Sequence, residues 1–200
     1  MNGPLDEPVD GPVDGPVNGP LDEPVDEPVN GPVDEPVNGP VDEPVRASVT
    51  LRRIRWWDLK DIVALERALF PSDPWTHEQF WSELAGVPAT RHYILAEDAG
   101  DIVGYAGLIA TRHEADIQTV AVRADRQGTG IGVLLVTELL AEARRRGVGE
   151  VVLEVRADNE PAQRLYTRFG FTQVGVRRGY YRRVDGHPID ALLMRWRPHG

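Results

Sequence analysis

The 200-residue chain is long enough for one domain with a substantial core, and it has no cysteine, which excludes a disulfide framework, a thiolate zinc site and a cysteine nucleophile. Its net charge of −10 arises in residues 1–45, which hold twelve acidic and no basic residues, whereas residues 46–200 hold 20 acidic and 22 basic residues. The nearly neutral body argues against nucleic acid as a partner, and without a membrane-length apolar run or a signal pattern we expect a cytoplasmic protein with no membrane partner.

Residues 1–45 repeat every four positions in the order Pro, Val or Leu, Asp or Asn, Gly or Glu. Proline obstructs helices and sheet ladders, and one aliphatic residue in four cannot bury enough surface to offset the chain entropy. We therefore expect a disordered, solvated acidic tail, followed by one folded domain over residues 46–200. The tail could be a docking segment for a partner, or a repeat expansion with no specific role.

Deleting residues 1–45 is expected to leave the melting temperature essentially unchanged, because a tail of this composition does not pack on a core. Thermal unfolding of the full-length and truncated proteins in the same buffer checks this expectation. A large drop in the melting temperature of the truncated protein would show that the tail belongs to the fold and that the boundary at residue 46 is wrong.

The body begins with a strand and a helix. Val49–Ile54 has the pattern of a strand, and Asp58 is expected to cap a helix over residues 59–69 that ends before Pro71. The apolar spacing of this helix also includes Glu66.

A second helix and three strands follow. Thr76 and Gln79 match a capping box, which predicts a helix through Leu84 that ends at Gly86. Strands are then predicted at His92–Glu97, Ile102–Ala110 and Ile117–Val122, with a turn at residues 99–101.

The last third of the body continues the alternation of helices and strands. The predicted elements are a helix from about Gly130 to Arg146 closed by Gly147, a strand at Val151–Val155, a helix at Asn159–Phe169, and strands near Gln173–Tyr180 and Ile189–Trp196. This mixed order indicates an α/β sheet with helices packed on it.

The glycine loop before the long helix has the pattern of an anion site. Residues 127–132 read Gln-Gly-Thr-Gly-Ile-Gly and follow a predicted strand. Free N–H groups at a helix start favour a phosphate. A Walker loop is excluded because it requires a lysine next to the glycines, and the only lysine of the chain is Lys60. A dinucleotide-binding fold has its glycine motif after the first strand, whereas this loop follows about the fourth predicted strand. A glycine turn without a ligand is the structural alternative.

Glu154 is the one acidic residue inside the apolar strand Val151–Val155. Burying a carboxylate costs free energy unless the group is paired or has a function. Burial also favours the protonated form, so the group takes up a proton more readily, as a general base must. The alternative is a structural ion pair, with Arg156 on the same strand face as the candidate partner.

Tyr166 lies on the apolar stripe of the next predicted helix, beside Ala162, Leu165 and Phe169. Without further context, a core tyrosine is the commoner fate of such a residue.

Two motifs together resemble the GCN5-related N-acetyltransferase (GNAT) family. One consists of residues 120–122, the loop 127–132 and the helix that follows. The other is Asn159–Tyr166 with Phe169-Gly170-Phe171. The resemblance covers nearly all of residues 49–197. It implies a mixed, mostly antiparallel sheet that is splayed between its fourth and fifth strands and flanked by helices.

The resemblance also implies acetyl-CoA as cosubstrate and roles for individual residues. The main chain of Val120, Ala121 and Val122 would hold the acetyl and pantetheine end of acetyl-CoA, and Asn159 would bond the pantetheine region. The pyrophosphate would lie at the glycine loop and the helix start, which consist of Gln127, Gly128, Thr129, Gly130, Ile131, Gly132 and Val133. Glu154 would accept the proton of the attacking amine, and Tyr166 would donate to the departing thiolate. No metal is expected, because the five histidines show no metal-ligand spacing.

Within the family, four segments resemble the bacterial branch that acetylates the N-terminal alanine of a small-subunit ribosomal protein. They are residues 153–156, the Asn159 motif, Arg177–Tyr181 and residues 190–194. Trp75, Tyr180 and Tyr181 are then the candidate substrate-binding residues, and a ribosomal protein is the candidate partner. The acidic tail and the inserted Ser72-Asp73 depart from that branch.

Two alternatives stand beside this interpretation. The first is an acetyltransferase for a small amine, which an acidic pocket would favour. The second is a non-catalytic acyl-CoA-binding module with the tail as its interaction arm, against which the presence of both Glu154 and Tyr166 argues.

Overall fold

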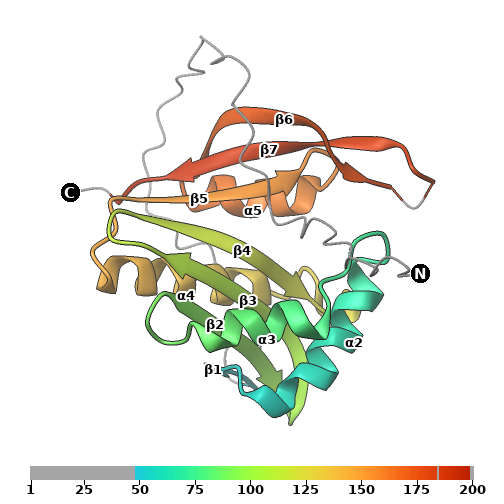
Figure 1. Ribbon diagram of the computed structural model, residues 1–200. Coiled ribbons are helices and arrows are strands. Elements are labelled where there is room, and N and C mark those ends of the chain that lie inside the picture. The colour runs from blue at the N-terminus through green and yellow to red at the C-terminus, as the bar shows by residue number, and fades with distance from the viewer. Residues whose placement is uncertain (1–47, 184, 199–200) are drawn as a thin grey trace, which may run out of the picture.

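The protein is an α/β sheet with helices on both faces. The computed structural model describes residues 48–183 and 185–198 (Figure 1). The described strands form one seven-stranded sheet in the order β1-β2-β3-β4-β5-β7-β6. Only β4 and β5 pair in parallel. The expected mixed, mostly antiparallel fold is confirmed, whereas the predicted tail at residues 1–45 lies outside the described residues.

Every predicted strand and helix is present, with ends shifted by a few residues. The strands are β1 (Val49–Arg53), β2 (Arg91–Asp98), β3 (Asp101–Ala110), β4 (Glu114–Val122), β5 (Glu150–Arg156), β6 (Thr172–Arg182) and β7 (Pro188–Trp196). The helices are α2 (Leu59–Leu69), α3 (His77–Ala85), α4 (Ile131–Arg145) and α5 (Glu160–Arg168), with short 3-10 helices η1 (Trp56–Asp58) and η2 (Ala124–Arg126). Among the described residues, no helix has the length and apolar character needed to cross a membrane.

The capping signals have different outcomes at the first two helices. At α3 the capping box is confirmed, because Thr76 Oγ1 accepts from the N–H of Gln79 and Gln79 Oε1 accepts from the N–H of Thr76. The expected cap of α2 by Asp58 is wrong, since its carboxylate makes no cap bond. The Asp58 carboxylate binds the Arg52 guanidinium of β1 at 2.7 Å and accepts from the N–H of Arg55. Both partners lie outside α2.

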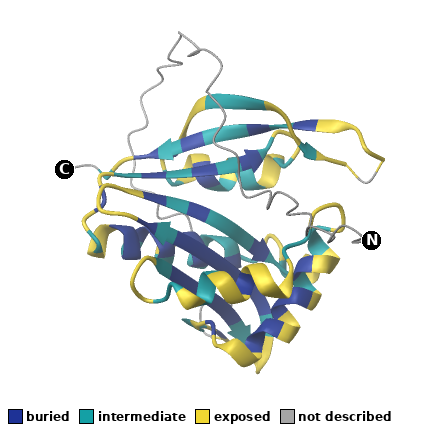
Figure 2. Ribbon diagram, viewed as in Figure 1, coloured by how far each residue is buried: buried dark blue, intermediate teal, exposed yellow. Residues whose placement is uncertain are grey.

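Helices α2 and α3 cover one face of the sheet, and α4 and α5 lie behind the other (Figure 1). Each face has its own apolar core, and β2 and β3, which lie between the two cores, are buried along most of their length (Figure 2). On the α2–α3 side, Tyr93 and Tyr105 are fully buried. Gly107 leaves room for the Tyr93 ring, which would lie 2.1 Å from a β-carbon at that position. The sheet is therefore a rigid support for the residues along its centre.

Strands β4 and β5 separate after four residue pairs. Their pairing runs from Glu114↔Glu150 to Ile117↔Leu153 and then stops. Beyond it, β4 continues beside β3 as far as Val122, and β5 continues beside β7 as far as Arg156. The expected splay between the fourth and fifth strands is thus confirmed. It leaves main-chain groups of both strands turned toward a gap in the middle of the sheet.

Candidate active site

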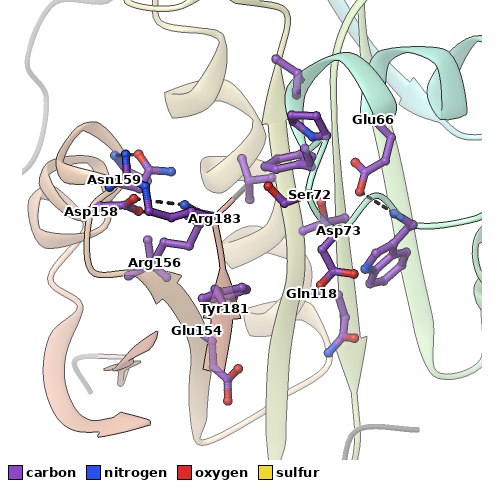
Figure 3. Close-up of a pocket in the computed structure, with 18 of the residues that line it drawn as sticks. Glu66, Ser72, Asp73, Gln118, Glu154, Arg156, Asp158, Asn159, Tyr181 and Arg183 are labelled. Carbon is purple, nitrogen blue, oxygen red and sulfur yellow. Dashed lines mark hydrogen bonds and ion pairs between the residues drawn. The ribbon is translucent and has the colours of Figure 1, made fainter. Parts of the chain in front are cut away.

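A pocket of about 810 Å³ lies where β4 and β5 separate. Its walls come from the α2–α3 loop, both strands, the start of α5 and the β6–β7 hairpin (Figure 3). Seven charged side chains line it, five of them acidic: Glu66, Asp73, Glu154, Asp158 and Asp185, with Arg156 and Arg183. A cavity of this size with a predominance of carboxylates suits a ligand that carries an amino group.

Glu154 faces this pocket from β5 and is held by a guanidinium. Its Oε1 accepts from Nη1 of Arg177 on β6 at 2.5 Å, and 29% of its side chain is exposed. The ion pair that the sequence suggested, with Arg156, is wrong: Arg156 binds Asp158 at 3.0 Å. Glu154 is therefore paired and pocket-facing at once.

Tyr166 lies on α5 and lines the same pocket. Its ring is buried edge-on against Phe171, with ring centroids 5.7 Å apart. Burial, and then the neighbouring Tyr181, raises the pKa of the Tyr166 phenol above its usual range. The hydroxyl therefore stays protonated at neutral pH and can act as a hydrogen-bond or proton donor there.

Glu66 is a pocket residue that the sequence reasoning did not single out. It lies on α2 and is only 3% exposed. Its Oε1 accepts from the backbone N–H of Trp75 at 3.0 Å, and its Oε2 accepts from the Tyr105 hydroxyl. Burial raises the pKa of this carboxyl to about 7. The signal in the sequence is its place on the apolar stripe of α2, where an acidic residue requires partners.

The raised pKa of Glu66 predicts a pH-dependent stability. Between its ordinary pKa of about 4.3 and its folded pKa of about 7, the folded protein holds a proton that the unfolded chain has released. The resulting stabilisation is complete below the unfolded pKa and is lost as the pH rises through about 7. The Glu66→Gln protein cannot titrate there, so its melting temperature should fall less than that of the unaltered protein between about pH 5 and pH 8.

Thermal melts of the Glu66→Gln protein at both pH values, with Glu160→Gln at an exposed position of α5 as the matched control, check this. The control should keep the pH slope of the unaltered protein. Equal slopes for all three proteins would show that Glu66 does not titrate as proposed.

The glycine loop does not line the pocket; it lies at the start of α4. Gly128 and Gly130 have φ of +77° and +93°, which glycine adopts without strain. The Gln127 side chain donates to the carbonyl of Val122, and the Thr129 hydroxyl donates to the carbonyl of Arg126. These two side chains thus brace the loop itself. The first helical bond of α4 is donated by Leu134, so the N–H groups of residues 131–133 precede the helix ladder.

The glycine at position 132 also has a packing role. A β-carbon there would lie 3.2 Å from Cδ2 of Leu165 on α5, so the glycine permits the close approach of α4 and α5. Ile131 is fully buried in the core. At both positions only the main chain is available to a ligand.

The remaining predicted residues divide between the pocket and its surroundings. Val120, Asn159, Trp75 and Tyr181 line the pocket together with Glu154 and Tyr166. Asn159 uses its Oδ1 to cap α5 by accepting from the N–H of Ala162, which leaves its amide nitrogen as a donor.

Ala121, Val122 and Tyr180 lie outside the pocket lining. The Ala121 side chain is buried in the α2–α3 core. Tyr180 lies against the guanidinium of Arg177, 4.0 Å from its carbon, and packs edge-on against Tyr181. Tyr180 therefore contacts both members of the Glu154–Arg177 ion pair.

Comparisons with known proteins agree on one family. The model of the acetyltransferase (GNAT) family matches residues 55–171. The N-alpha-acetyltransferase RimI of Mycobacterium tuberculosis is 41% identical over 152 residues, which cover 74% of this chain and 91% of that protein. The [ribosomal protein bS18]-alanine N-acetyltransferase of Escherichia coli is 34% identical over 121 residues, 60% of this chain and 79% of that protein.

Solved structures show the same fold. The crystal structure of the ribosomal-protein-S18-alanine N-acetyltransferase from Escherichia coli superposes with a TM-score of 0.67 at 30% identity, over 74% of this chain and 93% of that one. Ard1 from Thermoplasma volcanium has a TM-score of 0.68 at 24% identity, over 76% of this chain and 99% of that one, and shows likeness of fold alone.

Proposed function

Because the chain belongs to the acetyltransferase (GNAT) family, we propose that it moves an acetyl group from acetyl-CoA to the α-amino group of a protein N-terminus. The proposed substrate is the N-terminal alanine of the small-subunit ribosomal protein bS18, on which similar proteins act by name. The observation that carries this proposal is the placement of Glu154 and Tyr166 on two walls of one pocket where the sheet opens.

The first step is removal of a proton from the substrate. An α-amino group has a pKa near ~8, so much of it is protonated at neutral pH and cannot attack. Glu154 accepts that proton, directly or through water. Arg177, bound to one carboxylate oxygen at 2.5 Å, holds the Glu154 side chain in position at the pocket.

The neutral amine then attacks the carbonyl carbon of the thioester. A C–N bond forms, the C–S bond breaks, and the electron pair of that bond leaves on sulfur, while the nitrogen gives its second proton to water and becomes the amide N–H. Tyr166 gives its phenolic proton to the sulfur and later regains one from solvent. No covalent enzyme intermediate is needed, in keeping with a chain that has no cysteine.

Acetyl-CoA fits the residues around the gap. The main chain of Val120–Val122 lies along the edge of β4 that β5 leaves unpaired. The N–H groups of residues 128–133 at the start of α4 would hold the pyrophosphate, since a helix N-terminus favours an anion. The free amide nitrogen of Asn159 would donate to the pantetheine arm.

Mass spectrometry tests the substrate. The full chain is incubated with acetyl-CoA and peptides that differ only in their first residue. We expect the alanine-initiated peptide of bS18 to gain one acetyl group on its α-amine. Acetylation confined to lysine side chains, or to none of the peptides, would overturn the proposal.

One observation favours the small-amine alternative. Five carboxylates against two guanidinium groups line the pocket, and such a balance attracts polyamines. Including spermidine in the same assay separates the two functions. A kcat/KM for spermidine above that for every peptide would select the small-amine activity.

A Tyr166→Phe variant is expected to lower kcat while it largely keeps the affinity for acetyl-CoA. The change removes only the donor hydroxyl from a buried ring, so packing against Phe171 is retained. Steady-state kinetics and calorimetry with acetyl-CoA measure the two quantities. A variant with full kcat would return Tyr166 to the role of a core tyrosine.

A further inference from the structure

Gln118 occupies a special position on β4. The pairing with β3 runs from Gly107↔Thr119 to Leu108↔Ile117, so Gln118 is the extra residue of a β-bulge. It is also the first residue of β4 past the last pair with β5, Ile117↔Leu153. A bulge re-aims a side chain, and the Gln118 side chain lines the pocket.

Asp116 fixes the Gln118 amide. Nε2 of Gln118 donates to Oδ2 of Asp116 at 2.7 Å. Burial, and then the charge of Glu154, raises the pKa of Asp116 to about 6, so the carboxyl is mainly ionised at neutral pH. An ionised carboxylate only accepts hydrogen bonds, so the amide must turn its NH₂ group toward Asp116. The Gln118 carbonyl oxygen is then the group left for the pocket.

Glu154 and Gln118 extend into the pocket from neighbouring strands. Figure 3 shows both side chains among those that line the pocket, Glu154 from β5 and Gln118 from β4. Among the described residues, no donor is hydrogen-bonded to the Gln118 carbonyl oxygen. A primary amine beside Glu154 keeps two N–H groups after it gives up a proton, and each requires an acceptor once water is displaced.

We propose that the side-chain carbonyl of Gln118, oriented by Asp116, accepts a hydrogen bond from the amino group that is acetylated. The inference rests on the proposed function and adds a substrate-binding residue and its positioning residue to it. With one N–H bound to Gln118, the nitrogen lone pair is held toward the thioester while Glu154 takes the proton. Gln118 therefore acts on the binding of the amine and not on the binding of acetyl-CoA.

The test separates these two bindings. Gln118→Met keeps the length of the side chain but removes its carbonyl. We expect KM for the peptide to rise by about 3–10-fold, the effect of one neutral hydrogen bond, with KM for acetyl-CoA within about twofold of its original value. Gln118→Asn, which keeps the amide but shortens its reach, should raise the peptide KM in the same way and serves if the Met variant does not fold.

Two variants of Asp116 test the positioning. Asp116→Asn still offers a carbonyl to Nε2, so it should keep the peptide KM within about twofold. Asp116→Ala removes the acceptor and should raise that KM about as much as Gln118→Met does. The double variant Asp116→Ala/Gln118→Met should rise no further, because residues that act as one unit are not additive.

Peptide KM values unchanged in both Gln118 variants would overturn the inference, and so would additive effects of Asp116→Ala and Gln118→Met. Activity of the unaltered protein decides the proposed function separately. If it acetylates a small primary amine and no peptide, the proposed function fails. The same KM pattern measured with that amine then supports the inference, and a flat pattern overturns it.

Discussion

A Glu154→Gln variant is expected to lose about 10²–10⁴-fold in kcat at neutral pH, the usual contribution of a general base. Glutamine keeps the shape of the side chain and can still accept from Arg177, but it cannot take the proton of the α-ammonium group. Part of the loss should be recovered above about pH 8, where the amine is already neutral. Initial rates across this pH range, with saturating acetyl-CoA, measure both effects.

The matched control for this variant is Arg177→Gln. It removes the guanidinium that binds Glu154 at 2.5 Å and leaves the carboxylate in place. If Glu154 is a base, the control should keep much more activity than Glu154→Gln. Equal losses in the two variants, without recovery at high pH, would instead assign Glu154 to a structural ion pair.

Gly130→Glu should abolish measurable binding of acetyl-CoA. The glutamate would place a side chain and a negative charge at the helix start where the pyrophosphate is proposed to lie, and like charges held together cost several kcal/mol. We expect Kd to rise on the order of 100-fold or more in calorimetry. Unchanged affinity would remove the loop from the cosubstrate site.

The control must account for backbone strain, because Gly130 has φ of +93° and any side chain is strained there. Gly100, in the turn between β2 and β3, has φ of +92° and open space around it. Gly100→Glu therefore carries the same substitution and the same strain away from the loop. It should retain the affinity for acetyl-CoA, while the melting temperatures of both variants report the strain.

Local signals in the sequence predicted the elements of the fold well. The capping box at Thr76, the glycine at the start of α4 and the alternating strands each depend on neighbours within a few residues, and all are present in the structure. The family resemblance singled out Glu154 and Tyr166, and both side chains line the pocket.

Most of the errors and omissions involve partners on other elements of the fold. Arg177 reaches Glu154 across 23 positions, and Tyr105 reaches Glu66 across 39. The Asp58 carboxylate binds Arg52 of β1 instead of capping the helix that it precedes. The bulge at Gln118 depends on the register with β3. Such contacts arise from the packing of whole elements, which hydrophobic periodicity does not encode.

Only four residue pairs join β4 to β5, so the sheet consists of two halves held together at one end. We propose that the cosubstrate occupies the gap, and it would then supply hydrogen bonds that a continuous strand pair would otherwise make. A ligand that binds only the folded state raises the free energy of unfolding by about 2.7 kcal/mol at a hundred times its Kd. Saturation with acetyl-CoA would thus stabilise the folded arrangement of the two halves of the sheet. This stabilisation would decrease as the cellular concentration of acetyl-CoA falls.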